Sequence, residues 1–418
     1  MVKKKINQVY YKIIDYTILL LPLFFFLGTA AINLVLFFFS ILFLFFSAKK
    51  NDWTWLLEDY VKVFIFFWIY VVILSLFSNN VYESFKSSFF LIKFFLFFLL
   101  ISFYAFKKIT LNYILKIWFL FVLFLCFDLY YQYIFNKDIF GYPVAAGQRY
   151  SALFGEELIA ASFIAQIMAP IIGLILYFIF FIKKNFYIKL VLLLILLFVF
   201  LATIITGERM NTVFLFSLFS LVVFSFSLFR KNFYIIFFLV GIILISIISF
   251  KNIQAVKHRY LDFGNSISAI YNSSHGKLFD SAYRLWLKKP LTGWGLKNYR
   301  VVCDKELQDI NLNTGHPLCS THPHNLYLEL LSETGLVGFS LYFLFIFFFL
   351  RKILLKLNFK KNKNNANFAI VFSCLISVLL MLFPFKSAGS FATSWNGTFF
   401  WLLFGIILNR SFFLKKIT

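Results

Sequence analysis

The sequence predicts an all-α polytopic membrane protein, with about twelve transmembrane helices and one large periplasmic loop between helices 9 and 10. Of the 418 residues, 62% are hydrophobic and 14% are charged, whereas soluble domains are about 45–50% apolar and about 25% charged. A soluble fold of this length cannot enclose so much apolar surface. Two further observations predict this fold: the long apolar runs, and the clusters of basic residues that separate them.

The apolar runs give the expected helices, because about 17–25 apolar residues cross the hydrocarbon layer. The twelve runs are 13–28, 30–47, 60–77, 88–105, 112–134, 158–182, 189–206, 211–229, 233–250, 325–350, 367–385 and 391–409. The first two runs are expected to form a tight hairpin around Gly28-Thr29-Ala30, with Pro22 kinking the first helix. The first run lacks a small-residue cleavage site and the second follows at once, so we expect no cleavable signal peptide.

The basic residues predict the orientation. Lysine and arginine form short clusters in alternate connections, such as 3–5, 107–108 and 360–363. This is the positive-inside pattern, which places these connections and both termini in the cytoplasm of a bacterium, with the protein in the inner membrane. The net charge of +23 therefore reflects membrane topology and membrane-lipid contacts, and no nucleic-acid partner is expected.

Three segments follow from this topology. Residues 1–250 are expected to hold helices 1–9 with short loops, residues 251–324 the large periplasmic catalytic loop, and residues 325–418 helices 10–12. The long loop contains all five histidines, and histidine's avoidance of lipid explains part of that clustering. They are His258, His275, His316, His322 and His324.

The last histidine precedes an expected helix. Pro323 suits a first helical turn, and the leucines that follow recur at helical spacing, with Glu329 and Glu333 one turn apart on another face. The helix dipole disfavours an imidazolium near this end, so His324 would be a neutral imidazole, as a general base requires. The free N–H groups there could also hold a phosphate.

The motif residues resemble a known family. His324-Asn325 followed by Gly335 and Gly338 is similar to the signature of the O-antigen ligase family. The upstream stretch 284–296, with Arg284, Gly293 and Gly295, also resembles a region shared by O-antigen ligases and polymerases. The resemblance covers roughly residues 140–345 together with the twelve-helix topology and its late loop.

This resemblance implies a membrane glycosyltransferase that moves a glycan from undecaprenyl pyrophosphate to lipid A–core at the periplasmic face. It assigns His324 to activating the acceptor hydroxyl, and Arg209 and Arg284 to binding the pyrophosphate, whose oxygens match the planar arginine fork. Further substrate contacts are expected from Arg149, Asn325, His322 and Arg300. Arg149 lies in a stretch where Ala152 replaces an expected glycine. No cofactor is expected, because a pyrophosphate leaving group carries its own activation.

Three other functions could use the same residues. A metal site is disfavoured because the spacing of His322 and His324 does not suit two ligands on one helix face and no carboxylate pair adjoins them. An O-antigen polymerase, which joins two lipid-linked glycans, stays open because Arg284 and Gly295 have a spacing associated with polymerases. A non-catalytic transporter of lipid-linked glycans would need ionisable residues at mid-membrane, and only Lys93 and Asp128 qualify.

The cysteines divide into two pairs. Cys126 and Cys374 fall inside apolar runs, whereas Cys303 and Cys319 fall in the long loop. The periplasm is oxidising, so the loop cysteines are expected to form a disulfide. Among the histidines, His324 as the proposed base is expected to tolerate no substitution, whereas His258 and His275 should be replaceable.

Overall fold

The computed structural model describes residues 2–145, 149–182, 185–230, 273–307, 318–356 and 365–413. Across these ranges the chain is helical, and its extended pairing is limited to two isolated β-bridges. The helices are α1 (Val2–Leu19), α2 (Leu21–Phe26), α3 (Thr29–Lys50), α4 (Asp59–Ser75), α5 (Val81–Phe90), α6 (Ile92–Tyr104), α7 (Leu111–Phe135), α8 (Ala160–Phe181), α9 (Phe186–Ile205), α10 (Arg209–Arg230), α14 (Ser274–Lys288), α15 (Tyr299–Leu307), α16 (Leu326–Lys356), α18 (Ala366–Met381), α19 (Ser394–Leu408) and α20 (Arg410–Phe413). Two short 3₁₀ helices cover Thr54–Leu57 and Ala152–Phe154.

Seven of the described helices are long and apolar enough to cross a membrane. They are α3, α5 and α6 taken together as one span (Val81–Tyr104), α7, α8, α9, α10 as far as Leu228, and α16. The multi-pass membrane fold is therefore confirmed, because apolar helices of this length bury their backbone polar groups within themselves. The expected count of twelve is not reached.

Five expected spans are not among these seven helices, and each case has a structural explanation or lies outside the described residues. The expected spans 60–77, 367–385 and 391–409 correspond to helices of 17, 16 and 15 residues, at or below the lower end of the length that crosses the hydrocarbon layer. The first expected span is divided between α1 and α2, with Pro22 at the start of α2. The expected span 233–250 lies outside the described residues. The twelve-span count and the sidedness of the loops stay predictions.

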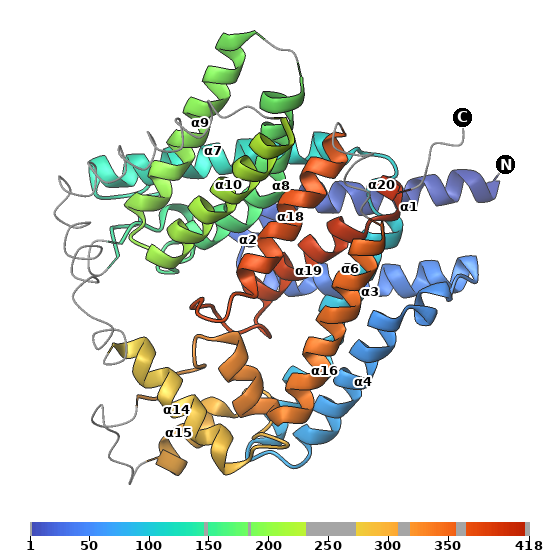
Figure 1. Cartoon of the computed structure of the whole chain (residues 1–418), viewed down its shortest axis with the longest axis vertical. Coiled ribbons are helices and arrows are strands. Elements are labelled where there is room, and N and C mark those ends of the chain that lie inside the picture. The colour runs from blue at the N-terminus through green and yellow to red at the C-terminus, as the bar shows by residue number, and fades with distance from the viewer. Residues whose placement is uncertain are drawn as a thin grey trace.

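The helix that carries the candidate motif, α16, is broken at Gly335, where the backbone takes φ 63° and ψ −172°. After the break, stacked rings join α16 to its neighbours. Phe349 stacks on Phe404 of α19 with ring centroids 3.9 Å apart, and Phe345 packs against Trp401 of α19 at 5.5 Å. Figure 1 shows α16 running beside α4, with α14 and α15 at the end of the bundle where α16 begins.

Candidate active site

His324 and Asn325 lie directly before α16, and Asn325 caps the helix. Its buried Oδ1 accepts hydrogen bonds from the backbone N–H groups of Tyr327 and Leu328, at 3.0 and 3.1 Å. Asparagine is a favoured N-cap because its side-chain oxygen satisfies N–H groups that have no partner in the helix. The cap fixes where the helix begins, and therefore where the adjacent imidazole lies.

The segment between α18 and α19 holds the same two residues from the other side. The N–H of Ala388 donates to the carbonyl oxygen of His324 at 2.8 Å, and Nδ2 of Asn325 donates to the Pro384 carbonyl at 2.6 Å. The hydroxyl of Tyr327 donates to the Leu382 carbonyl at 2.6 Å. His324 itself has φ 56°, so its backbone is held in the left-handed region by bonds on both sides.

Three imidazoles gather at this point. The ring centroids of His322 and His324 are 4.0 Å apart, and that of His275, in the first turn of α14, lies 5.3 Å from His324 in an edge-to-face arrangement. Burial lowers the pKa of His324 below its usual value, and His275 lowers it further. Burial also lowers the pKa of His322 to about 3, with added repulsion from His324, Lys297 and Arg300. The cluster is therefore uncharged at neutral pH.

The four motif glycines lie in one junction. The segment Pro290–Gly295 runs along the break in α16: Trp294 N–H donates to the Ser332 carbonyl at 3.0 Å, Gly295 N–H to the Glu333 carbonyl at 2.7 Å, and Leu336 N–H to the Pro290 carbonyl at 2.9 Å. A Cβ on Gly293 would lie 2.6 Å from the nitrogen of Gly335. The two segments can approach this closely only because glycine has no side chain.

The other two glycines face different neighbours. A Cβ on Gly295 would lie 2.6 Å from Cβ of Ser78, and one on Gly338 would lie 2.9 Å from the ring of Tyr70 on α4. The Tyr70 hydroxyl also donates to the Thr334 carbonyl at 2.9 Å. Together these contacts join the α4 side of the bundle to the start of α16.

Two carboxyl groups are buried in the first turns of α16. Glu329 and Glu333 are each 1% exposed, and each keeps one oxygen without a hydrogen-bond partner. The other oxygen of Glu333 accepts from the Tyr299 N–H at 3.4 Å, and that of Glu329 from the Phe391 N–H at 3.3 Å. Lys297, whose ammonium donates to Ser390 Oγ at 2.5 Å, attracts both carboxyl groups.

The expected arginines act on different partners. Arg284 pairs with Asp280 of its own helix α14 at 3.3 Å, and Arg300, at the start of α15, is close enough to act on His322 and Glu329. Arg149 instead acts on Glu208, the residue before Arg209 at the start of α10.

Glu208, at the start of α10, has a raised pKa. Burial raises its pKa to about 7, and hydrogen bonds from the Ala161 N–H and the Asn211 amide lower it, as does the charge of Arg149. Arg149 therefore acts on a carboxyl group that takes up a proton near neutral pH, and Arg209 follows that group directly in the chain.

Cys303 and Cys319 form a disulfide, with their Cα atoms 5.7 Å apart. Cys303 belongs to a small buried cluster with Leu285, Trp294 and Tyr299. The bridge therefore ties the segment that leads to His322 and His324 to the α14–α15 pair. Cys126 and Cys374 are buried and free.

Sequence reasoning missed Lys386. It lines a cavity of about 60 Å³ with Gln166, Ala388, Asn396 and Trp401 among others, and its ammonium lies 4.5 Å from the ring centroid of Phe214. Burial lowers its pKa to about 8. The signal in the sequence is a single lysine between two apolar runs, in a connection that otherwise lacks basic residues.

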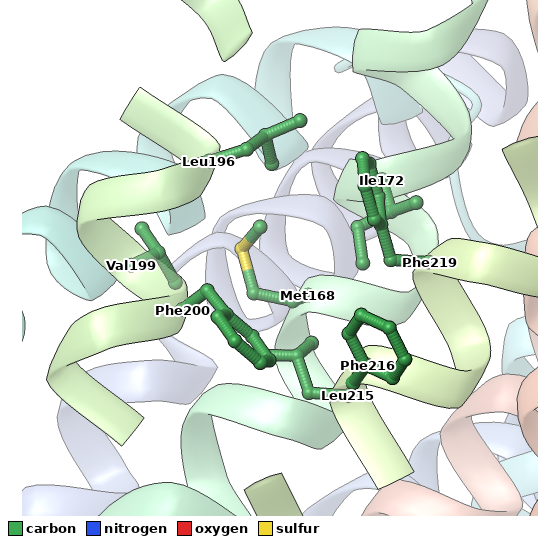
Figure 2. Close-up of a pocket in the computed structure, with 8 residues that line it drawn as sticks. All are labelled: Met168, Ile172, Leu196, Val199, Phe200, Leu215, Phe216 and Phe219. Carbon is green, nitrogen blue, oxygen red and sulfur yellow. The ribbon is translucent and has the colours of Figure 1, made fainter. Parts of the chain in front are cut away.

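A second cavity, of about 20 Å³, lies between α8, α9 and α10. Figure 2 shows Met168 between side chains of α9 and α10, and every lining residue is apolar. This small apolar cavity offers no group for proton transfer or phosphate binding. In the described ranges, no group of three or more His, Cys, Asp or Glu residues has a geometry that would hold a metal ion.

Comparison with known proteins identifies the stretch that carries this site. Residues 197–343 match the family model described as O-antigen ligase. A protein of Rickettsia conorii named "Putative polysaccharide ligase" is 32% identical over 98 residues, which cover 23% of this chain and 22% of that protein. The matched family stretch includes Arg209, Arg284 and His324, whereas Arg149 lies before it. The resemblance to the O-antigen ligase family is confirmed.

Proposed function

We propose, from the resemblance of residues 197–343 to O-antigen ligases, that this protein is a membrane glycosyltransferase. It moves a glycan from undecaprenyl pyrophosphate to lipid A–core at the periplasmic face of the bacterial inner membrane. One observation supports the proposal most. His324 is held in place by the adjacent Asn325 cap and by the hydrogen bond from the Ala388 N–H to its carbonyl oxygen, and its imidazole has a lowered pKa.

His324 acts as the general base in this proposal. It takes the proton of the acceptor hydroxyl as that oxygen attacks the anomeric carbon, and the bond to the pyrophosphate breaks with its electron pair leaving on the phosphate. A base must be unprotonated to start this step, which the lowered pKa of His324 ensures at neutral pH. We assign Asn325 a positioning role in place of the expected substrate contact, because its amide is already engaged with Tyr327, Leu328 and Pro384.

Cations stabilise the leaving group. Charge grows on the pyrophosphate as the glycosidic bond to it breaks, and fixed positive groups are then worth most. We assign this role to Arg284 and Arg209, with Arg149 and Arg300 as further contacts. Lys386 adds a fifth cation beside the motif, because its neighbours Pro384 and Ala388 bind Asn325 and His324 directly.

Polymerase activity would use the same donor with a second lipid-linked glycan as acceptor. The assay therefore presents both acceptors to purified protein in liposomes: lipid A–core, and an excess of lipid-linked repeat unit. Transfer to lipid A–core is the expected product. Chain growth without that product would replace the ligase reaction with the polymerase reaction.

The central test is His324→Ala. Loss of a general base lowers a rate by about 10²–10⁴-fold, so transfer should fall by that factor with normal membrane insertion. Lys305→Ala, at an exposed position of α15, is the control and should keep full activity. Near-normal transfer by His324→Ala would refute the assignment of the base. Activity should also survive a chelator, and rescue of a chelated sample by a divalent ion would overturn the metal-free mechanism.

A further inference from the structure

Each transfer leaves one proton on His324 if the proposed function is right, and that proton must leave before the next turnover. The acceptor O–H bond breaks, a C–O bond forms at the anomeric carbon, and the pyrophosphate departs with the electron pair of the broken bond. The proton from the hydroxyl remains on the imidazole. His324 is only partly exposed, so its route to water depends on the groups around its ring.

Two imidazoles touch His324, and they differ in exposure. On one side is His322, whose Nε2 is buried and has no hydrogen-bond partner. On the other side is His275, whose ring lies edge-on to His324 with centroids 5.3 Å apart and which is exposed at the start of α14. The three rings therefore run from His322, whose Nε2 is enclosed, through His324 to the solvent-exposed His275.

We propose that His275 is the proton exit of the site: it accepts the proton from His324, directly or through one water molecule, and releases it to solvent. No oxidant, reductant or further reactant is needed, because the proton moves from the acceptor hydroxyl to His324, then to His275, then to water. His275 does not touch the reacting atoms in this scheme and is a positioning residue for proton release.

The surrounding charges favour this direction. Lys297 and Arg300 face His322 and oppose a positive charge on it, so His322 cannot take the proton at neutral pH. Asp280 lies on α14, the helix of His275, and is paired with Arg284. The side chain of His275 is exposed to solvent, and desolvation of part of its ring lowers its pKa, so a proton that reaches it passes readily to water.

The test is His275→Asn in purified protein with the lipid-linked donor. We expect the transfer rate to fall about tenfold or more, a part of the about 10²–10⁴-fold that a positioned proton acceptor supplies. Imidazole in the buffer should restore the rate, because it can accept the proton from His324. Pyrazole has a similar shape and is a far weaker base, so it should restore nothing.

The matched control is Phe279→Leu, which removes the ring packed against His275 at 6.4 Å and leaves all imidazoles in place. It should keep the rate within twofold or so of the unchanged protein. Equal losses in both variants without imidazole rescue would mean that His275 only packs, and full activity of His275→Asn would also overturn the proposal.

These outcomes separate the exit from the function itself. If His324→Ala is inactive and His275→Asn is fully active, the base stands and the exit is wrong. If His324→Ala keeps full transfer, the proposed base is wrong whatever His275 does.

Discussion

The break in α16 should make Gly335→Ala strongly destabilising. Gly335 has φ 63° and ψ −172°, a region of backbone space that is essentially restricted to glycine and costs other residues about 1–3 kcal/mol. The new Cβ would also lie 2.5 Å from the Thr292 nitrogen and closer still to the Leu291 carbonyl. Displacing that backbone adds about 1–3 kcal/mol, so we expect a total loss of about 2–6 kcal/mol in the free energy of unfolding.

Gly28→Ala is the matched control for this prediction. Gly28, before α3, has φ 93° and ψ −177°, so alanine meets the same backbone restriction there, but nothing lies within 4 Å of its Cβ position. The difference between the two variants isolates the close approach of Pro290–Gly295 to α16. Unfolding by SDS titration in mixed micelles measures both. If Gly335→Ala loses no more stability than Gly28→Ala, the junction is not tightly packed.

The other predictions concern the disulfide and the cations. Replacing Cys303 and Cys319 by serine opens a loop of 16 residues, and the chain-entropy estimate for such a loop is about 3 kcal/mol; SDS titration with and without reductant checks it, and unchanged stability would contradict it. Arg209→Lys and Arg284→Lys should each recover only part of the activity lost in the alanine variants, because lysine lacks the planar fork; full rescue in donor-transfer assays would reduce both positions to general positive charge. Lys386 has its pKa lowered to about 8, so it is charged below that pH and neutral above it. Donor binding should therefore weaken as the pH rises through about 8, and a Lys386→Arg variant should remove that step; an identical step in the variant would assign it to another group.

Much of the fold could be predicted from periodicity and composition. The turn expected at Gly28 is where α3 begins, and the expected runs at 112–134 and 158–182 correspond to α7 and α8. Helix length was predicted less well. Apolar residues continue beyond the end of α18, and α19 begins later than the apolar run that contains it. Hydropathy does not show where the backbone stops being helical, so the apolar runs 367–385 and 391–409 are longer than the helices they contain.

The candidate site was only partly predictable. His324 and the motif glycines could be selected because their spacing is local, within one segment of the chain. Lys386 and the contacts to Ala388 and Pro384 could not, because they come from more than 55 residues further along the chain and depend on how α18 and α19 fold back. The approach of His275 to His324 was missed for the same reason, since the rest of α14, α15 and the disulfide segment lie between them in the chain. The sequence alone therefore predicts that His275 is replaceable, whereas the proton exit proposed from the structure predicts that it is not.

The junction between Pro290–Gly295 and the break in α16 has a consequence for how sequences of this kind can diverge. Its hydrogen bonds join backbone atoms to backbone atoms, and the side chains of Leu291, Leu336 and Val337 within it are 62%, 40% and 42% exposed. Substitutions at such exposed positions change the stability little, whereas a side chain at any of the glycines would clash with neighbouring atoms. A saturating mutational scan should therefore find a sparse pattern, with intolerant glycines set among freely exchangeable neighbours. Two proteins could share this junction in full while having identical residues at few of the positions between the glycines. The spaced motif would then be retained after the overall sequence identity has become low.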